Sequence, residues 1–314
     1  MTNNAEQLIT NIEAMQVKGA YLITRVALEA LTLRAKEATD RAEPLPDVLA
    51  TAAKRLQTAQ PSMASVANAC AYVLYPFTEP QTASLSAQEV QQLIATRSRE
   101  FLLGLEEAQQ RVVEVGSRVV KDGDVIFIHS YTGTLLGIFK RAREAGKRFR
   151  IIATESRPYC EGRTMVAELL ELGIDCTLII DAAIGSYLNG ANKALVGSDS
   201  ILANGSVVNK IGTQLVALTC HHYGLPLYAA GSILKLSLES LQGTEVKLLE
   251  RTDDAGIATE ELSKNRGLQV ENRIFDLTPA QYIEALITDK GIMSPAAIVT
   301  FLDNPFFEGR THGA

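Results

Sequence analysis

The 314-residue sequence lacks long apolar runs and clusters of basic residues, and each absence excludes a class of protein. No uninterrupted apolar stretch is long enough to cross a membrane, so we expect no membrane partner. Lysine and arginine number 30 against 36 aspartates and glutamates, which gives a net charge of −6, and no polybasic run occurs. Because nucleic-acid binding needs clustered Lys and Arg to neutralise phosphates, we also expect no nucleic-acid partner.

Cysteine is scarce, and no glycine-rich nucleotide motif follows an apolar run. The four cysteines are scattered without the spacing of metal ligands or disulfides: Cys70, Cys160, Cys176 and Cys220. Cys176 and Cys220 are expected in the core. Cys160 begins a helix near Glu155 and Arg157, and it would be reactive only in an activating environment. The sequence therefore predicts no metal site and no cofactor.

The remaining composition is that of an ordinary globular protein. Hydrophobic residues make up 46% of the chain, and its length is sufficient for two domains. The first residues lead directly into a polar helical pattern rather than a signal peptide. We therefore expect a soluble, cytoplasmic protein.

Residues 1–121 carry helical periodicity, with apolar residues recurring at three- and four-residue spacing. The expected helices cover residues 5–17, 22–38, 47–58, 61–74 and 86–120. No strand pattern is convincing before residue 124. We predict an N-terminal α-helical domain over residues 1–121.

From residue 122 onward, short apolar runs alternate with helical segments. The expected strands cover residues 125–128, 149–153, 174–180, 194–196 and 225–230. This alternation is typical of a parallel sheet with right-handed crossovers, and near-continuous apolar strands indicate a sheet covered on both faces. The predicted fold class is α/β, with a Rossmann-like, doubly wound parallel-sheet domain over residues 122–314.

Polar side chains follow the predicted strands directly. They are Ser130, Glu155, Arg157, Asp181, Asp199 and, a few residues further from its strand, Lys235. In a doubly wound sheet the carboxyl ends of the strands share one edge, where ligands bind at the topological switch point. The sequence therefore predicts a ligand site at this edge.

Residues 197–213 carry the strongest local signal. Asp199 falls just past a short apolar run, and Asn204-Gly205 is typical of a turn. Apolar residues then recur at helical spacing: Val208, Ile211, Leu215 and Leu218. This pattern predicts strand, loop and helix, with Asn209 and Lys210 in the first helical turn. A carboxylate facing a lysine and free helix amides suits a phosphorylated polyol, although a capped loop is the alternative.

These motifs resemble the family that joins the regulatory subunits of initiation factor 2B (alpha, beta and delta) to two sugar-phosphate isomerases. Those enzymes are ribose-1,5-bisphosphate isomerase and methylthioribose-1-phosphate isomerase. The resemblance covers nearly the whole chain and is carried by residues 154–158, 197–199, 204–205, 209–213, 275–279 and 288–292. It implies a helical domain packed on a Rossmann-like domain, and assembly through C-terminal domains into a homodimer or larger homo-oligomer. The apolar segment over residues 292–307 is the expected contact.

The resemblance also implies site residues. The isomerases carry protons on an aspartate, matched here by Asp199, and on a cysteine, whose position holds Ser130. A serine hydroxyl is far less acidic than a thiol and is a poor proton carrier without an activating base. Lys18 and Gln60 stand where the isomerases usually have arginine. The expected substrate-binding residues are Lys18, Gly19, Ala20, Gln60, Arg157, Asn209, Lys210 and Lys235.

Two functions follow from the resemblance. The first is an aldose-phosphate to ketose-phosphate isomerase that uses Asp199, with Ser130 or a neighbour in place of the cysteine. The alternative is a catalytically silent protein that senses a sugar phosphate or nucleotide, as the initiation factor 2B alpha subunit would. Both predict a phosphorylated sugar or nucleotide as ligand.

Overall fold

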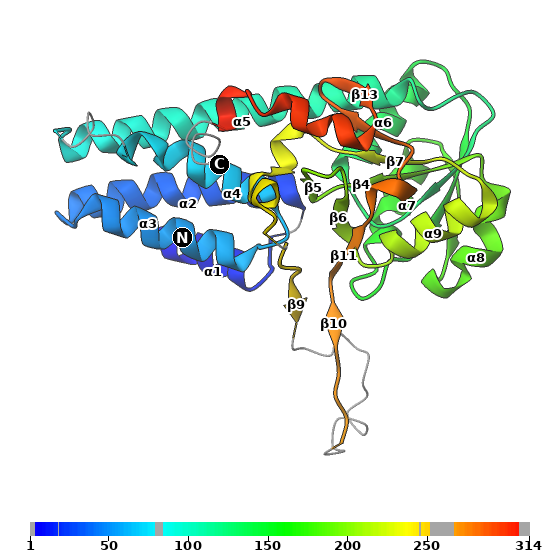
Figure 1. The fold of residues 1–314 in the computed structure, drawn as a ribbon, viewed down its shortest axis with the longest axis horizontal. Coiled ribbons are helices and arrows are strands. Elements are labelled where there is room, and N and C mark those ends of the chain that lie inside the picture. Colours follow the sequence, from blue (N-terminus) through cyan, green and yellow to red (C-terminus); the bar gives the residue numbers. More distant parts are fainter. Residues whose placement is uncertain (1–3, 18, 79–83, 245, 252–266, 308–314) are drawn as a thin grey trace.

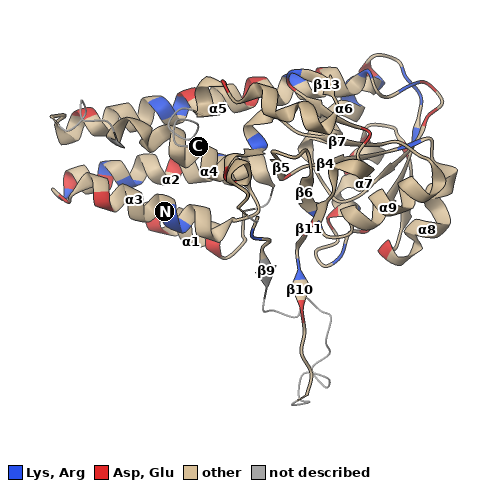
Figure 2. Cartoon of the chain, in the orientation of Figure 1, with Lys and Arg blue, Asp and Glu red and all other residues tan. Residues whose placement is uncertain are grey.

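The computed structural model describes residues 4–17, 19–78, 84–244, 246–251 and 267–307. A helical part and a part built around a sheet lie side by side (Figure 1). Within the described ranges, no helix is both long and apolar enough to span a membrane. Basic residues are interspersed with acidic ones (Figure 2), as where Arg55 bonds to Glu6 and Glu13 at 2.8 and 2.9 Å.

The first part consists of helices whose starts are set by local capping. They are α1 (Ala5–Glu13), α2 (Ala20–Asp40), α3 (Leu45–Ala59), α4 (Ala64–Leu74) and α5 (Ala87–Ser117). Asn4 caps α1 by accepting from the Gln7 amide at 2.8 Å. Ser86 and Glu89 form a reciprocal capping box at the start of α5. The predicted helices are confirmed, with ends displaced by a few residues.

The second part is built on a seven-stranded sheet in the order β13-β12-β7-β4-β1-β2-β3. Its strands are β1 (Val125–Ile128), β2 (Arg150–Thr154), β3 (Asp175–Ile179), β4 (Lys193–Gly197), β7 (Leu227–Ala230), β12 (Ala285–Thr288) and β13 (Gly291–Met293). All neighbours pair in parallel except β12 and β13. From β1 the chain proceeds to β2 and β3 on one side, and then returns to β4 on the other. The topological switch point therefore lies between β1 and β4.

Helices cover both faces of this sheet, as the continuous apolar strands predicted. Ile126 and Ile128 of β1 pack in a core with side chains of α5, α6 (Gly133–Glu144) and α7 (Glu161–Glu171). Phe127, which points to the opposite face, packs in a second core with α8 (Ile184–Tyr187) and α9 (Thr213–Tyr223). The α/β fold is confirmed. The domain boundary after residue 121 stays a prediction, since α5 contacts α2 as well as α6 and β12.

A smaller, four-stranded sheet adjoins the large one and was not predicted. In the order β11-β6-β5-β8, it contains β11 (Phe275–Thr278), β6 (Val207–Lys210), β5 (Ser200–Leu202) and β8 (Leu236–Ser237). A further pair joins β9 (Glu250–Arg251) and β10 (Asn272–Arg273).

The placement of Asn209 and Lys210 in a helical turn was wrong, because both lie on strand β6. The Asn204-Gly205 turn closes a hairpin in which β5 and β6 pair antiparallel, with Gly205 at φ +80°. Helix α9 begins only at Thr213, after Gly212 at φ +100°. Its buried side chains are Thr213, Val216, Ala217 and Cys220, whereas Leu215 and Leu218 are 49% and 42% exposed.

Candidate functional site

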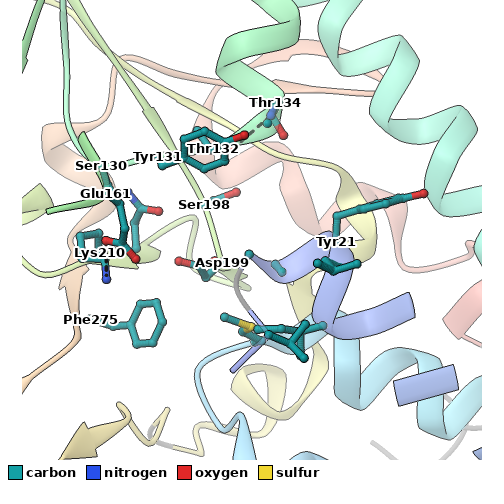
Figure 3. A pocket seen from close by; sticks show the side chains of 18 of the residues that line it. Tyr21, Ser130, Tyr131, Thr132, Thr134, Glu161, Ser198, Asp199, Lys210 and Phe275 are labelled. Carbon is teal, nitrogen blue, oxygen red and sulfur yellow. Dashed lines mark hydrogen bonds and ion pairs between the residues drawn. The ribbon is translucent and has the colours of Figure 1, made fainter. Parts of the chain in front are cut away.

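A cavity of about 870 Å³ opens between the carboxyl edge of the large sheet and the helical part (Figure 3). It brings together most of the predicted site residues: Gly19, Ala20, Gln60, Ser130, Asp199, Asn209, Lys210 and Lys235. Lys18 lies outside the described residues. Arg157 does not line this cavity. The sheet side is polar, and the helical side is largely apolar, with Met15, Val17 and Met63.

The loop after β1 is held by a chain of buried hydrogen bonds. His129 Nε2 lies 2.7 Å from the Ile211 carbonyl, which can only accept, so Nε2 carries the proton and donates. His129 Nδ1 then accepts from Thr154 Oγ1 at 2.6 Å, and Thr154 Oγ1 accepts from Ser156 Oγ at 2.9 Å. Ser156 Oγ in turn accepts from the Ser130 amide at 2.7 Å.

This chain fixes a strained backbone at Ser130, which has φ +69°. Burial lowers the pKa of His129, which favours the neutral ring that the hydrogen bonds require. His129 therefore positions Ser130 at the cavity and is not itself among the residues that line it.

Three other predicted strand-end residues hold the chain rather than line the cavity. Asp181 accepts from the Ser156 amide at 2.8 Å and from the Arg157 amide at 2.7 Å. Glu155 forms an ion pair with Arg163 at 2.6 Å. Asp181 thus bridges two neighbouring loops and Glu155 ties its own loop to α7, so a strand-end carboxylate alone does not identify a ligand contact.

Asp199 lies just beyond β4 and Lys235 follows β7, and their opposite charges interact. Burial raises the pKa of Asp199, and the positive charges of Lys235 and Lys210 oppose the rise. Burial also lowers the pKa of Lys235, which Asp199 opposes; the ammonium donates to the Ser198 carbonyl at 2.5 Å. The net direction is a raised pKa, which is the shift that suits a carboxyl acting as an acid.

Strand β6 presents Asn209 and Lys210 to the cavity. Asn209 Nδ2 donates to Thr213 Oγ1 at 3.0 Å, which fixes its side chain. Lys210 is 6% exposed, and its ammonium lies 5.2 Å from the ring centre of Tyr159 and 5.6 Å from that of Phe275. An ammonium between two aromatic faces is a directed, desolvated cation, suited to a phosphate.

The sequence reasoning missed Glu161, which lines the same cavity and lies 3.0 Å from the Lys210 ammonium. Its one signal was its place two residues beyond Tyr159, at the start of a helix. Acids there are usually explained by the helix dipole, so nothing marked it as a site residue. Cys160 does not line the cavity, and its Sγ lies 3.9 Å from Arg157 Nη1. The described residues contain no cluster of three metal ligands.

Comparison with known proteins agrees with this architecture. The model of the initiation factor 2 subunit family matches residues 16–295. Ribose 1,5-bisphosphate isomerase from Archaeoglobus fulgidus is 37% identical over 284 residues, covering 90% of this chain and 88% of the relative.

Solved structures extend the likeness to the fold. Translation initiation factor eIF-2B from Pyrococcus horikoshii OT3 superposes with a TM-score of 0.80 at 31% identity, covering 94% of this chain and 98% of that one. The fold of 5-methylthioribose 1-phosphate isomerase from the same organism is also similar, with a TM-score of 0.73 at 24% identity, covering 95% of this chain and 87% of that one. The chain therefore belongs to the initiation factor 2 subunit family, as the resemblance predicted.

Proposed function

We propose that this protein is a sugar-phosphate isomerase that converts an aldose phosphate to a ketose phosphate, similar to ribose 1,5-bisphosphate isomerase. The observation that carries the proposal is the cavity at the switch point, where Asp199 lies beside Lys210 and Lys235. Relatives named ribose 1,5-bisphosphate isomerase match at 37% and 32% identity over 90% and 96% of the chain. We propose that the protein is located in the cytoplasm, where enzymes meet free sugar phosphates.

Each side of the cavity has a role in this reaction. Lys210 and Asn209, with Lys235, bind the phosphate through charge and hydrogen bonds. Asp199 gives and takes one proton, because moving a carbonyl between adjacent carbons needs an acid and a base beside them. Ser130 occupies the position of the cysteine of the isomerases, and the second proton is carried there or by a neighbouring group.

The alternative is a protein that binds the same ligand without turning it over. Ser130 is the observation that favours it, since a serine hydroxyl lacks the acidity of a thiol. Binding would then serve to sense a sugar phosphate or nucleotide.

The deciding experiment is an NMR assay in heavy water. The protein is incubated with ribose 1,5-bisphosphate, methylthioribose 1-phosphate or ribose 1-phosphate, and the products are identified. We expect a ketose that carries solvent deuterium at carbon 1, beside the new carbonyl, because a proton lifted from carbon 2 exchanges with solvent. A ketose without deuterium would indicate hydride transfer instead.

Ser130→Cys provides the comparison that separates the two functions. Measurable binding with no turnover by either the wild type or Ser130→Cys would establish the sensing function. Turnover by the wild type would establish the isomerase.

We also propose that the chain forms a homodimer through the outer side of the sheet domain. Large apolar side chains are exposed there on β3, α8 and α9 and just beyond them: Leu178, Ile180, Tyr187, Leu215, Leu218 and Tyr223. The apolar segment over residues 292–307 is instead largely used within the chain, where Phe306 packs on Tyr72 and Phe101 at 5.1 and 5.3 Å between ring centres. Light scattering at micromolar concentration should give a dimer for the wild type and a monomer for Leu218→Glu.

A further inference from the structure

Glu161 is a carboxylate at the cavity wall that has no role in the reaction as proposed above. It is the first residue of α7, and its side chain is 20% exposed, at the cavity wall. Its Oε2 is buried and makes no hydrogen bond within the described part of the chain. The ammonium of Lys210 is 3.0 Å away, so the contact is an ion pair rather than a well-formed hydrogen bond.

The start of α7 is fixed by close backbone contact. A side-chain carbon at Gly162 would lie 1.8 Å from the Thr154 carbonyl oxygen, so only glycine allows the helix to approach the end of β2. Glu161 is thereby held at the edge of the switch point. The helix N-terminus favours its negative charge.

Glu161 and Asp199 are two carboxyl groups in opposite environments. Burial raises the pKa of Asp199, and the charge of Glu161 adds to that rise. Glu161 instead lies against the buried ammonium of Lys210, at 3.0 Å. The carboxyl of Asp199 points toward the side of the cavity where Glu161 and Lys210 lie (Figure 3). Two carboxyl groups in different surroundings within one cavity are a common arrangement of a catalytic acid and base.

We propose that Glu161 is the second proton carrier of the isomerase, in the role that a cysteine at position 130 would otherwise fill. This inference rests on the proposed function. It assigns to Ser130 only a hydrogen bond to the ligand.

The proton movements balance for a cyclic aldose 1-phosphate. Glu161 removes the proton from carbon 2, and the C–H electron pair forms the double bond between carbons 1 and 2. The bond from carbon 1 to the ring oxygen breaks, and that oxygen takes the proton of Asp199. The 2-hydroxyl proton then passes to Asp199 as the carbonyl forms at carbon 2, while the proton on Glu161 exchanges with solvent and carbon 1 takes the exchanged proton from Glu161. Both carboxyl groups return to their starting states, and the product is a ketose 1-phosphate.

The phosphate itself prepares the base. In the free protein the Lys210 ammonium lies against Glu161. A bound phosphate competes for that ammonium and weakens its pairing with Glu161. The Glu161 carboxylate is thereby released toward the substrate when substrate is present.

The test is Glu161→Gln, which keeps the shape of the side chain and removes its proton-carrying group. The aldose 1-phosphate that the wild type converts is used for both binding and turnover. We expect kcat to fall by roughly 10²–10⁴-fold, the usual contribution of a positioned acid or base. Affinity should stay equal or increase, because Lys210 no longer has a competing partner. Glu155→Gln is the matched control: it removes a paired acid that does not line the cavity, and kcat should stay within about twofold.

Glu161→Asp is a second variant, which keeps the test decisive if Glu161→Gln does not fold. It keeps a carboxylate on a shorter side chain, so reduced turnover with retained deuterium uptake at carbon 1 is expected. Wild-type kcat in Glu161→Gln would overturn the inference, and so would a loss of affinity that matches the loss of kcat. If the wild type turns over no aldose phosphate, the proposed function has failed first, and the two failures are thereby distinguished.

Discussion

The loops after β1 and β4 differ from the loops after β2 and β3 in what their polar side chains contact, although all four loops begin at the same edge of the sheet. Ser130 and Asp199 face the cavity, whereas Asp181 holds the backbone beyond β2. The chain leaves β1 and β4 in opposite directions, which keeps a crevice open between them. The chain continues from β2 to the neighbouring edge strand β3 and turns back only after β3, and there Asp181 beyond β3 accepts from the backbone amides beyond β2. The same residue types therefore line the cavity on one side and cap the chain on the other.

The largest expected effect is the loss of turnover on changing Asp199, which lies on the cavity side of the sheet edge, called here the open side; the side of Asp181 and Arg157 is the closed side. Asp199→Asn keeps the shape and hydrogen bonding of the side chain and removes the proton it carries, so kcat should fall by roughly 10²–10⁴-fold. Ligand affinity should change only a few-fold, because the lysines that bind phosphate remain. The deuterium NMR assay and a calorimetric titration measure the two quantities. Equal losses of affinity and turnover would instead make Asp199 a binding residue.

A buried capping acid should give stability a pH dependence. Asp276 Oδ2 accepts from the amides of Gly212 and Gln214, while burial raises its pKa to about 6, against an ordinary 3.8. The folded state thus holds this proton more tightly than the unfolded state, so Asp276 favours folding below about pH 4 and loses that contribution as the pH rises to about 6. A tenfold difference in proton affinity corresponds to about 1.4 kcal/mol, so the contribution is on the order of 3 kcal/mol.

Urea denaturation from pH 4 to 7 measures this dependence. Asp276→Asn should flatten the decline that the wild type shows between those values. An identical pH dependence in both proteins would show that another group is responsible.

Lys210 and Arg157 provide a direct test of which basic residues bind the ligand. Lys210→Ala should weaken phosphate binding by about 1.5–3 kcal/mol, the range for hydrogen bonds to charged groups. Arg157→Ala is the control at the closed side, and affinity should change less than about twofold, because Arg157 does not line the cavity. Isothermal titration with one aldose phosphate measures both. A larger loss in Arg157→Ala than in Lys210→Ala would place the phosphate outside this cavity.

A stability effect of moderate size is expected from Asp181, the capping acid beyond β3. Asp181→Ala removes the acceptor of the Ser156 and Arg157 amides, which lie at a partly solvated loop. Unfolding free energy should fall by about 2 kcal/mol, below the full value of two charged hydrogen bonds because water replaces part of the loss. Urea denaturation at pH 7 gives the value. If stability is unchanged while ligand affinity collapses, Asp181 belongs to the ligand site.

The cavity shows how far sequence reasoning extends. Asp199 and Ser130 were located from strand ends and from the family motif, and both line the cavity. Asn209 and Lys210 were assigned to the cavity correctly but to the wrong element, since residues 207–210 form a strand. A short apolar segment fits a strand or a helix equally, and here the pairing of Lys210 with Phe275, far along the chain, selects the strand. Glu161 was missed because its partner Lys210 is distant in sequence.

The sequence by itself determined the periodic features: the helices before residue 124, the apolar strands of the large sheet and the polar residues that follow them. These features depend on the spacing of apolar and polar residues within a short segment, which favours a helix or a strand in that segment. Only the tertiary structure decided which strand-end residues line the cavity, because that depends on the order of strands in the sheet. It also decided that Lys210, Glu161 and Asp199 act on one another, since electrostatic contact and burial arise only when distant segments pack.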